Sequence, residues 1–98
     1  MDWIPYDPTW LVSLARQQHP DRPALAIALS QCTQASVTSP AYIHFVDDRN
    51  ANTPGAEWQF DENVLMDDPN EGDLVLDILK DGRVGGIEFL AKIDGGAA

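Results

Sequence analysis

Hydrophobic and polar positions alternate most regularly over residues 73–93, whose sequence is DLVLDILKDGRVGGIEFLAKI. Apolar residues recur at every second position of 74–78, and a second apolar run begins at Val84, which predicts two β-strands. Asp81 and Gly82 lie between the two runs, and this dipeptide favours a two-residue type I′ turn with positive φ at both positions. The pattern therefore predicts a C-terminal β-hairpin.

A loop at Asp81 and Gly82 determines which residues of the two strands face each other. On one face every large partner is apolar; the pairs are Leu74–Phe89, Leu76–Ile87 and Ile78–Gly85. The other face is half polar; its pairs are Val75–Glu88, Asp77–Gly86 and Leu79–Val84. We therefore expect the first face to be buried and the second to meet water or a partner.

Gly85 and Gly86 stand together inside the second predicted strand. Glycine weakens a strand by roughly 0.5–1 kcal/mol relative to alanine, so a pair of glycines needs a structural reason. A bulge or a helix that crosses the sheet is the first interpretation, and the close approach of a ligand or a partner is the alternative.

Helical spacing of apolar residues predicts a first helix near the start of the chain. Asp7 is suited to the N-cap, Pro8 to the first helical position, and Pro20 ends the helix. Its apolar stripe comprises Trp10, Leu11, Leu14 and Ala15. Large aromatic side chains in such a setting usually belong to the core, so we expect Trp3 and Trp10 to be core residues and not a ligand cage.

The alanine-rich segment that follows predicts a second helix over 23–34, capped by Asp21, with a loop at 36–40. A strand is the alternative for this region, because apolar residues also alternate from Leu25 and 33–39 is polar and β-branched. Such a strand would form a hairpin with residues 41–46.

The middle of the chain has the composition of strands separated by turns. The predicted strands are 41–46, 57–61 and 64–66; a polar loop at 47–56 and an acidic turn at 67–72 separate them from one another and from the hairpin. The fold class expected is α+β: an antiparallel sheet of about four strands, ending in the C-terminal β-hairpin, with one or two N-terminal helices packed on one face.

The length and composition predict one domain. Ninety-eight residues with 44% hydrophobic content supply a single core, so we expect 1–98 to be one α+β domain, mainly helical over 1–40 and a sheet over 41–93. No apolar run is long enough to cross a bilayer and no secretion signal is evident, which predicts a cytoplasmic protein without membrane contact. The one cysteine, Cys32, is expected to be a buried structural thiol.

The chain is strongly acidic: it contains six Lys and Arg and sixteen Asp and Glu, for a formal net charge of −10. The surplus is concentrated in 47–77, which carries ten acids and only Arg49 as a base. Direct nucleic-acid binding is not expected, because a protein needs cations to hold phosphates. A dense acidic surface instead favours attraction of a basic partner.

Motifs for a metal ion, a cofactor or catalysis are not recognised. In the acidic turn, Pro69 and Gly72 fall at positions that an EF-hand does not allow, and His19, His44 and Cys32 lack a metal-ligand spacing. An acid–base pair of His44 with Asp47 or Asp61 is formally possible, but the chain has neither a nucleophile elbow nor a phosphate-binding loop. We therefore expect a protein that is not an enzyme and has no cofactor.

The segment VLDILKDGRVGGIEFL at 75–90, preceded by the strand AYIHFV, resembles a widespread family of small bacterial proteins of unknown function. The hallmark of that family is a strand, an acidic-Gly-Arg turn, and a strand of the form VGIE-hydrophobic-Leu. The resemblance covers about 41–91. The helical front end, the EWQFDENVLMDDP segment and the Gly85–Gly86 pair depart from it.

With its size and charge, the chain also resembles immunity proteins of bacterial polymorphic toxin systems, including contact-dependent growth inhibition. This resemblance implies binding and neutralisation of a cognate toxin domain, such as a basic nuclease, through acidic residues and an aromatic anchor. The residues expected to bind the partner are Asp47, Asp48, Glu57, Trp58, Asp61, Glu62, Asp67, Asp68 and Glu71. The alternatives are a nucleic-acid mimic that inhibits or regulates a host complex, and a small ligand-binding domain.

Overall fold

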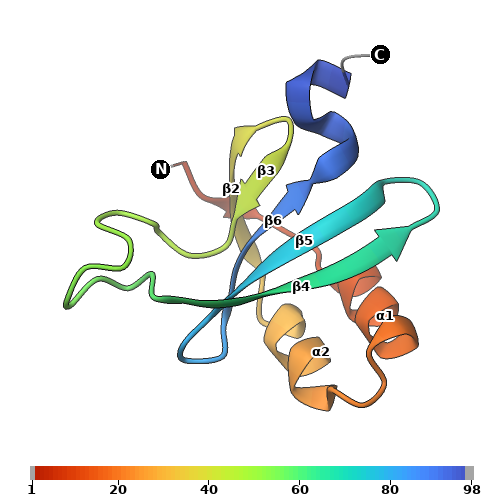
Figure 1. The fold of residues 1–98 in the computed structure, drawn as a ribbon, viewed down its shortest axis with the longest axis horizontal. Coiled ribbons are helices and arrows are strands. Elements are labelled where there is room, and N and C mark those ends of the chain that lie inside the picture. The colour runs from red at the N-terminus through yellow and green to blue at the C-terminus, as the bar shows by residue number, and fades with distance from the viewer. Residues whose placement is uncertain (1, 97–98) are drawn as a thin grey trace.

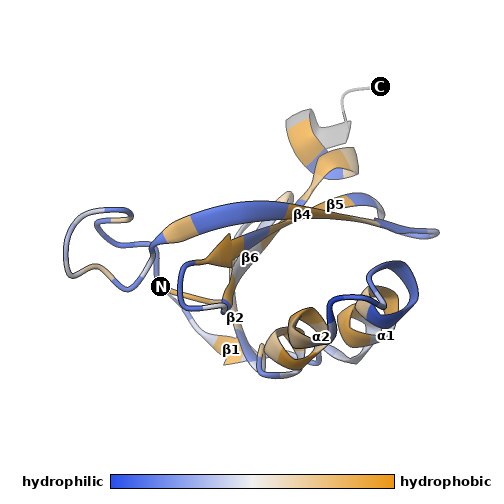
Figure 2. Cartoon of the chain, turned by 60° about the horizontal axis from the view of Figure 1, so that its bottom comes forward, coloured by the Kyte–Doolittle hydropathy of each residue, from blue (hydrophilic) through white to orange (hydrophobic). Residues whose placement is uncertain are grey.

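An antiparallel sheet of six strands and two α-helices make up the computed structural model over the residues it describes, 2–96 (Figure 1). The strands are β1 (Ile4–Pro5), β2 (Gln34–Ser39), β3 (Tyr42–His44), β4 (Phe60–Asp68), β5 (Gly72–Leu79) and β6 (Val84–Phe89), in the order β1-β2-β3-β6-β5-β4. Helices α1 (Thr9–Gln18) and α2 (Pro23–Ser30) lie on the same side of the sheet (Figure 2), and the 3-10 helix η1 (Leu90–Gly96) follows β6. The α+β class is confirmed, with six strands in place of about four.

The strands missed by the sequence analysis are β1 and β2. Helix α2 ends at Ser30, and β2 begins at Gln34, inside the segment predicted to finish the helix and then form a loop. The strand alternative is correct for this part, since β2 pairs with β3 through Ser36 opposite His44. Its polar sequence, QASVTS, carries a weak strand signal, so pairing with both neighbouring strands determines its conformation.

The core lies between the two helices and the sheet. Its largest fully buried side chains are Leu11, Leu29, Leu74, Leu76 and Ile87. Trp10 packs at the margin of this core, whereas Trp3 is 38% exposed, contrary to the prediction that it is a core residue. Trp3 directly precedes the short strand β1 at the edge of the sheet, where few side chains are available to cover it.

The first helix begins one residue later than predicted. Asp7 accepts hydrogen bonds from the backbone N–H of Thr9 at 3.0 Å and from its hydroxyl at 2.6 Å. Pro8 therefore precedes the first helical residue, Thr9, and does not occupy the first position itself. These two bonds hold the pKa of Asp7 below its usual value.

The C-terminal hairpin has the predicted register away from its turn. Leu74 faces Phe89, Leu76 faces Ile87, and Asp77 faces Gly86 on the other side of the sheet; Ile78, however, faces Val84 and not Gly85.

The hairpin turn is a three-residue loop, and the predicted two-residue type I′ turn is wrong. The backbone N–H of Gly82 donates to the carbonyl of Leu79 at 2.9 Å, the N–H of Leu79 donates to the carbonyl of Arg83 at 2.9 Å, and only Gly82 has positive φ (91°) in this loop. The extra loop residue shifts the pairing by one position, and a bulge at Gly85 restores it.

The bulge brings Gly85 and Gly86 beneath two aromatic rings. A Cβ atom at Gly85 would lie 2.7 Å from the Trp58 ring, and one at Gly86 would lie 2.5 Å from the Tyr42 hydroxyl oxygen. Trp58 forms a second, smaller core with Val46 and Leu79 on the face of the sheet opposite the helices. The bulge interpretation of the glycine pair is therefore confirmed.

The long edge strand β4 is continuous where two short strands were predicted, and helix α1 covers part of its free edge. The Gln18 side chain donates to the Asp67 carbonyl at 2.5 Å and accepts from the Asp67 N–H at 2.9 Å. The His19 ring lies 2.8 Å from the Leu65 carbonyl. These bonds occupy backbone groups that an exposed edge would otherwise offer to another chain.

Candidate functional site: the acidic open face

The face of the sheet opposite the helices carries a group of carboxylates. We define the acidic open face as Asp67, Asp73, Asp77 and Glu88, with Leu65 and Val75 between them. The register places Leu65 beside Val75 and Val75 beside Glu88 in one row, and Asp67 beside Asp73 in the next. Because side chains alternate along a strand, these residues point away from the helices. Val75 is the middle residue of the first row, and Leu65, on the edge strand β4, is 66% exposed.

Charge is distributed unevenly over the elements. The six strands contain seven acidic residues and no Lys or Arg; the acids are Asp61, Glu62, Asp67, Asp68, Asp73, Asp77 and Glu88. The cations lie on the helices, in the loops and on η1. The sheet therefore presents negative charge without cations of its own.

Asp67 and Asp73 face each other directly across β4 and β5. Both residues are exposed, and like charges in directly opposed cross-strand positions lower stability. Asp68 is the last residue of β4 and Glu71 lies in the turn that follows; the Asp68 carboxylate accepts hydrogen bonds from the backbone N–H groups of Asn70 and Glu71 at 2.9 and 2.8 Å. The turn thus concentrates carboxylates at one end of the sheet.

Asp77 is fixed in the middle of the open face by two donors. The Tyr42 hydroxyl donates to one carboxylate oxygen, and the Asn63 amide donates to the other at 2.7 Å. Burial, together with the neighbouring carboxylate of Asp77, raises the pKa of Tyr42 well above its usual value. Tyr42 therefore keeps its proton and holds the Asp77 carboxylate in place near neutral pH.

His44 connects the sheet to the following loop. Its Nε2 lies 3.0 Å from the Asp48 carboxylate, and its Nδ1 lies 3.2 Å from the Thr38 hydroxyl. The ring also packs against Tyr42 and Trp58, with centroid distances of 4.5 and 5.8 Å. His44 thus pairs with Asp48, and not with Asp47 or Asp61 as the sequence analysis considered. The two polar partners and the two aromatic rings hold the imidazole in one orientation.

Most of the other acids predicted to bind a partner already have an internal cation. Asp47 pairs with Arg49 at 2.7 Å, Glu57 with Arg83 at 2.7 Å, Glu62 with Arg22, and Glu71 with Lys92 at 2.9 Å. Asp61 and Asp67 are exposed, and Asp67 belongs to the acidic open face. Trp58 is 7% exposed and is a core residue, while Phe60 is 38% exposed at the start of β4.

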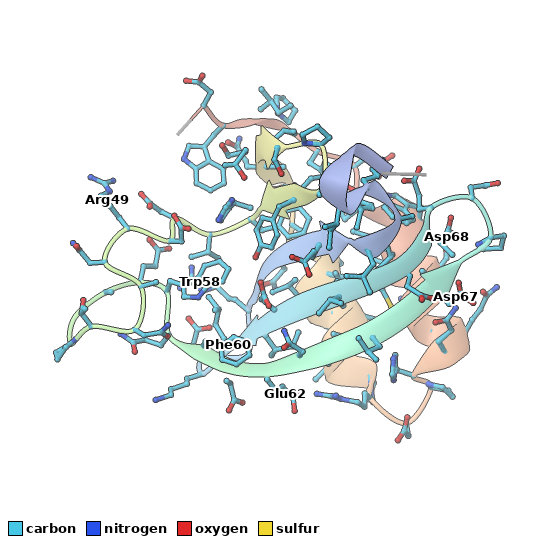
Figure 3. All side chains as sticks on the ribbon, turned by 45° about the horizontal axis from the view of Figure 1, so that its top comes forward. Arg49, Trp58, Phe60, Glu62, Asp67 and Asp68 are labelled. Atoms are coloured by element: carbon cyan, nitrogen blue, oxygen red, sulfur yellow. The ribbon has the colours of Figure 1, made fainter. Side chains whose placement is uncertain are left out.

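Most of the predicted residues lie near the two ends of β4, and Asp61 and Glu62 lie within it. Asp47, Asp48 and Glu57 belong to the loop before β4, and Asp67, Asp68 and Glu71 lie at or beyond its far end. Figure 3 shows Trp58 near the first end and Asp67 and Asp68 at the other. Since β4 has nine residues, these ends are roughly 26 Å apart at the usual rise of a strand. The structure therefore does not gather the predicted acids into one cluster.

Sequence reasoning missed Asp73, Asp77 and Glu88 as candidate site residues. The available signal was the hairpin register, which places Asp77 and Glu88 on the half-polar side. The number of acids per stretch of sequence is highest in the loops, so it indicated a loop site. The alternation of side chains along paired strands instead indicates which acids share one face of the sheet.

Within residues 2–96, no group of three or more His, Cys, Asp or Glu side chains is arranged to hold a metal ion. Neither of the described α-helices has the length and apolar content needed to cross a membrane. Comparison of the chain with family models, with curated proteins and with solved structures finds no match. Its function is therefore inferred from geometry and charge.

Proposed function

We propose that this protein is an immunity protein that binds a cognate bacterial toxin domain and neutralises it without catalysis. The acidic open face is the proposed binding surface, and a basic surface of the toxin is its complement. The observation that supports this most directly is that the face holds four of the seven strand acids, Asp67, Asp73, Asp77 and Glu88, and that no strand contributes a Lys or Arg. A surface of one sign attracts a partner of opposite charge over distances longer than contact.

The arrangement of the face supports binding beyond mere solubility. The exposed Leu65 and the half-buried Val75 lie among the carboxylates, so the face offers apolar contact area as well as charge. Interfaces commonly combine an apolar centre with a polar rim. A nuclease cleft that binds phosphates would meet carboxylates on this face, and their occupation of the cleft is how the protein would block it.

The opposed pair Asp67 and Asp73 gives a second supporting observation. Like charges in this position lower the stability of a sheet, and either residue replaced by lysine would form a favourable pair. A feature that lowers stability is commonly found where function requires it.

Capture followed by a growth assay tests the proposal. The tagged protein is used to capture partners from a lysate of its source cell, first at low and then at high salt, and bound proteins are identified by mass spectrometry. We expect one basic domain that arrests growth when expressed alone and permits growth when co-expressed with this protein. A captured domain that arrests growth equally in both cases would contradict the proposal, and capture of a host DNA-binding protein would favour the nucleic-acid mimic.

A further inference from the structure

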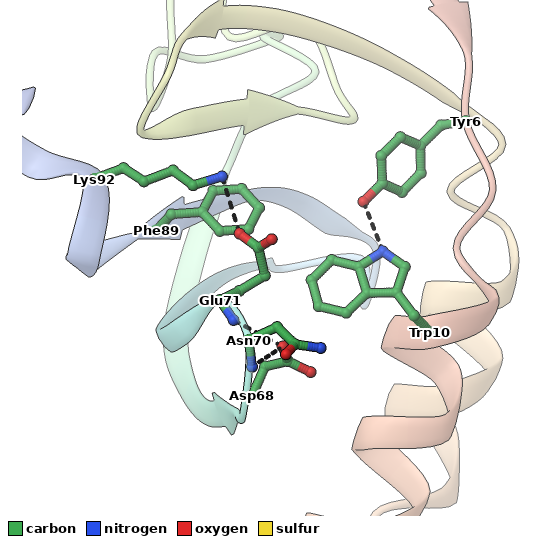
Figure 4. Close-up of a pocket in the computed structure, with 7 residues that line it drawn as sticks. All are labelled: Tyr6, Trp10, Asp68, Asn70, Glu71, Phe89 and Lys92. Atoms are coloured by element: carbon green, nitrogen blue, oxygen red, sulfur yellow. Dashed lines mark hydrogen bonds and ion pairs between the residues drawn. The ribbon is translucent and has the colours of Figure 1, made fainter. Parts of the chain in front are cut away.

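A pocket of about 460 Å³ lies between the first helix, the β4–β5 turn and η1 (Figure 4). Three aromatic side chains line it: Tyr6, Trp10 and Phe89. Trp10 is stacked on Phe89 with a centroid distance of 6.5 Å and an interplanar angle of 20°, and its indole N–H donates to the Tyr6 hydroxyl at 3.1 Å. The volume is within the range of small-ligand sites.

A carboxylate completes this aromatic pocket. Glu71 enters from the β4–β5 turn, where the Asp68 side chain accepts a hydrogen bond from its backbone N–H at 2.8 Å. The Oε2 atom of Glu71 is buried, and its one polar partner within the described residues is the Lys92 Nζ, 2.9 Å away. A carboxylate oxygen accepts up to two hydrogen bonds, so this atom has unused acceptor capacity.

Lys92 already occupies this pocket as a cation. Its Nζ lies 4.7 Å from the centroid of the Phe89 ring, besides its ion pair with Glu71. Aromatic faces and a carboxylate together form the environment that binds an ammonium or a guanidinium group. The Lys92 and Glu71 side chains are 46% and 35% exposed, so the pair is weak enough for an external cation to compete with it.

We propose that this pocket binds an arginine side chain of a partner protein, whose guanidinium displaces the Lys92 ammonium from Glu71 and Phe89. A guanidinium is planar, stacks on aromatic rings and donates two parallel hydrogen bonds to a carboxylate, which an ammonium does not. It would therefore use the acceptor capacity that Lys92 leaves unfilled. The inference rests on the proposed function only for the identity of the protein that carries the arginine.

The test titrates the full chain with N-acetyl-arginine methylamide and follows the NMR signal of the Trp10 indole N–H. The matched ligand is N-acetyl-citrulline methylamide, which has nearly the same shape and no charge. We expect saturable shifts with the arginine compound and none with the citrulline compound. Equal shifts with both ligands, or no shift with the arginine compound, would overturn the proposal.

Three variants locate the binding and test the displacement. Lys92→Ala removes the competing cation and is expected to tighten arginine binding about two- to fivefold, in proportion to a weak exposed ion pair. Glu71→Gln keeps the shape and is expected to weaken binding at least about tenfold, because binding then lacks its charge-assisted hydrogen bonds. Asp81→Asn, which breaks an ion pair with Arg83 outside the pocket, is the control and is expected to leave the affinity unchanged.

The outcomes separate the pocket from the proposed function. If Glu71→Gln bound the arginine compound as tightly as wild type, the binding site would be wrong. If Lys92→Ala bound it no more tightly than wild type, the displacement of Lys92 would be wrong. Arginine binding in the pocket without a growth-arresting partner would retain the pocket and reject the immunity function. A toxin that is neutralised and binds wild type and Glu71→Gln with the same affinity would support the immunity function and reject the pocket as the site of its arginine.

Discussion

Gly85 and Gly86 occupy positions of β6 where a side chain would meet atoms of other segments. At Gly85 the obstacle is the outer ring of Trp58, which is a side chain, whereas at Gly86 the backbone oxygen of Ile43 also lies 2.7 Å from the place that a Cβ atom would take. A side chain is able to shift or be replaced, but a strand backbone is held by its hydrogen bonds. A second substitution at Trp58 can therefore relieve the clash of an alanine at position 85, whereas no side-chain substitution removes the backbone oxygen that an alanine at position 86 would meet.

Gly85→Ala is expected to lower the free energy of unfolding by about 1–3 kcal/mol, because the new methyl group overpacks against Trp58. Trp58→Phe removes the outer ring, so the double variant should lose less than the sum of the single variants. Urea unfolding of the four proteins measures this coupling. For Gly86→Ala combined with Tyr42→Phe no comparable rescue is expected, since the Ile43 oxygen remains. Additive losses at Gly85 and Trp58 would contradict the contact.

Cys32 is the buried thiol that the sequence predicts, with 6% exposure. Burial raises its pKa from a usual value of 9.0 to about 12. The thiolate is the reactive form, so iodoacetamide at about pH 8 should modify the folded protein on the order of a thousandfold more slowly than the protein in urea. Mass spectrometry of timed samples measures both rates, and comparable rates would show that the thiol is accessible.

The same pKa shift gives a dependence of stability on pH. The folded state retains the Cys32 proton where the unfolded state loses it, so this contribution is complete below about pH 9 and is lost as pH rises toward about 12. Urea unfolding at increasing pH should therefore show a smaller alkaline loss of stability in Cys32→Ala than in wild type. An identical pH profile in the two proteins would contradict the assignment.

At the scale of elements, the long-range register of the β5–β6 hairpin was predictable and its turn was not. Apolar residues at Leu74 and Leu76 must face apolar partners, which leaves one alignment. An Asp-Gly pair, however, fits both a two-residue turn and a three-residue loop that contains a glycine. The choice depends on the bulge at Gly85, which accommodates Trp58 from a distant segment.

Asp73→Lys is expected to stabilise the β4–β5 hairpin, because it replaces a like-charge pair with an opposite-charge pair at Asp67. The expected gain in the free energy of unfolding is about 0.2–1 kcal/mol. Asp21→Lys changes the net charge equally at an exposed turn between the helices and serves as the control. Thermal and urea unfolding measure both, and an equal gain in the two variants would assign the effect to net charge alone.

Over the whole molecule, the pattern of predicted elements indicated the α+β class and the composition indicated the acidic character, whereas the position of the charge on the surface depends on the fold. The helices follow from apolar periodicity, but β2 has a polar sequence and depends on its neighbours. The acids of the loops are dense along the chain, yet Arg83 and Lys92 come from distant segments to pair with Glu57 and Glu71. Such pairings carry no local sequence signal.

Charge reversal on the acidic open face is expected to slow association with the partner. Asp67→Lys with Asp73→Lys changes the net charge from −10 to −6, since each substitution adds two charges; Asp2→Lys with Asp21→Lys makes the same change outside the strands. Steering depends on local potential as well as total charge. The two double variants therefore separate the face from the net charge.

The most direct measurement is the association rate constant of the proposed toxin partner, once captured, with wild type and with these two double variants, at low and at raised salt. We expect the variant of the open face to associate at least about tenfold more slowly than wild type at low salt, and the variant outside the strands to associate nearly as fast as wild type. Added salt should reduce the difference between the two association rate constants. Equal rate constants for the two double variants would contradict the assignment of binding to the acidic open face.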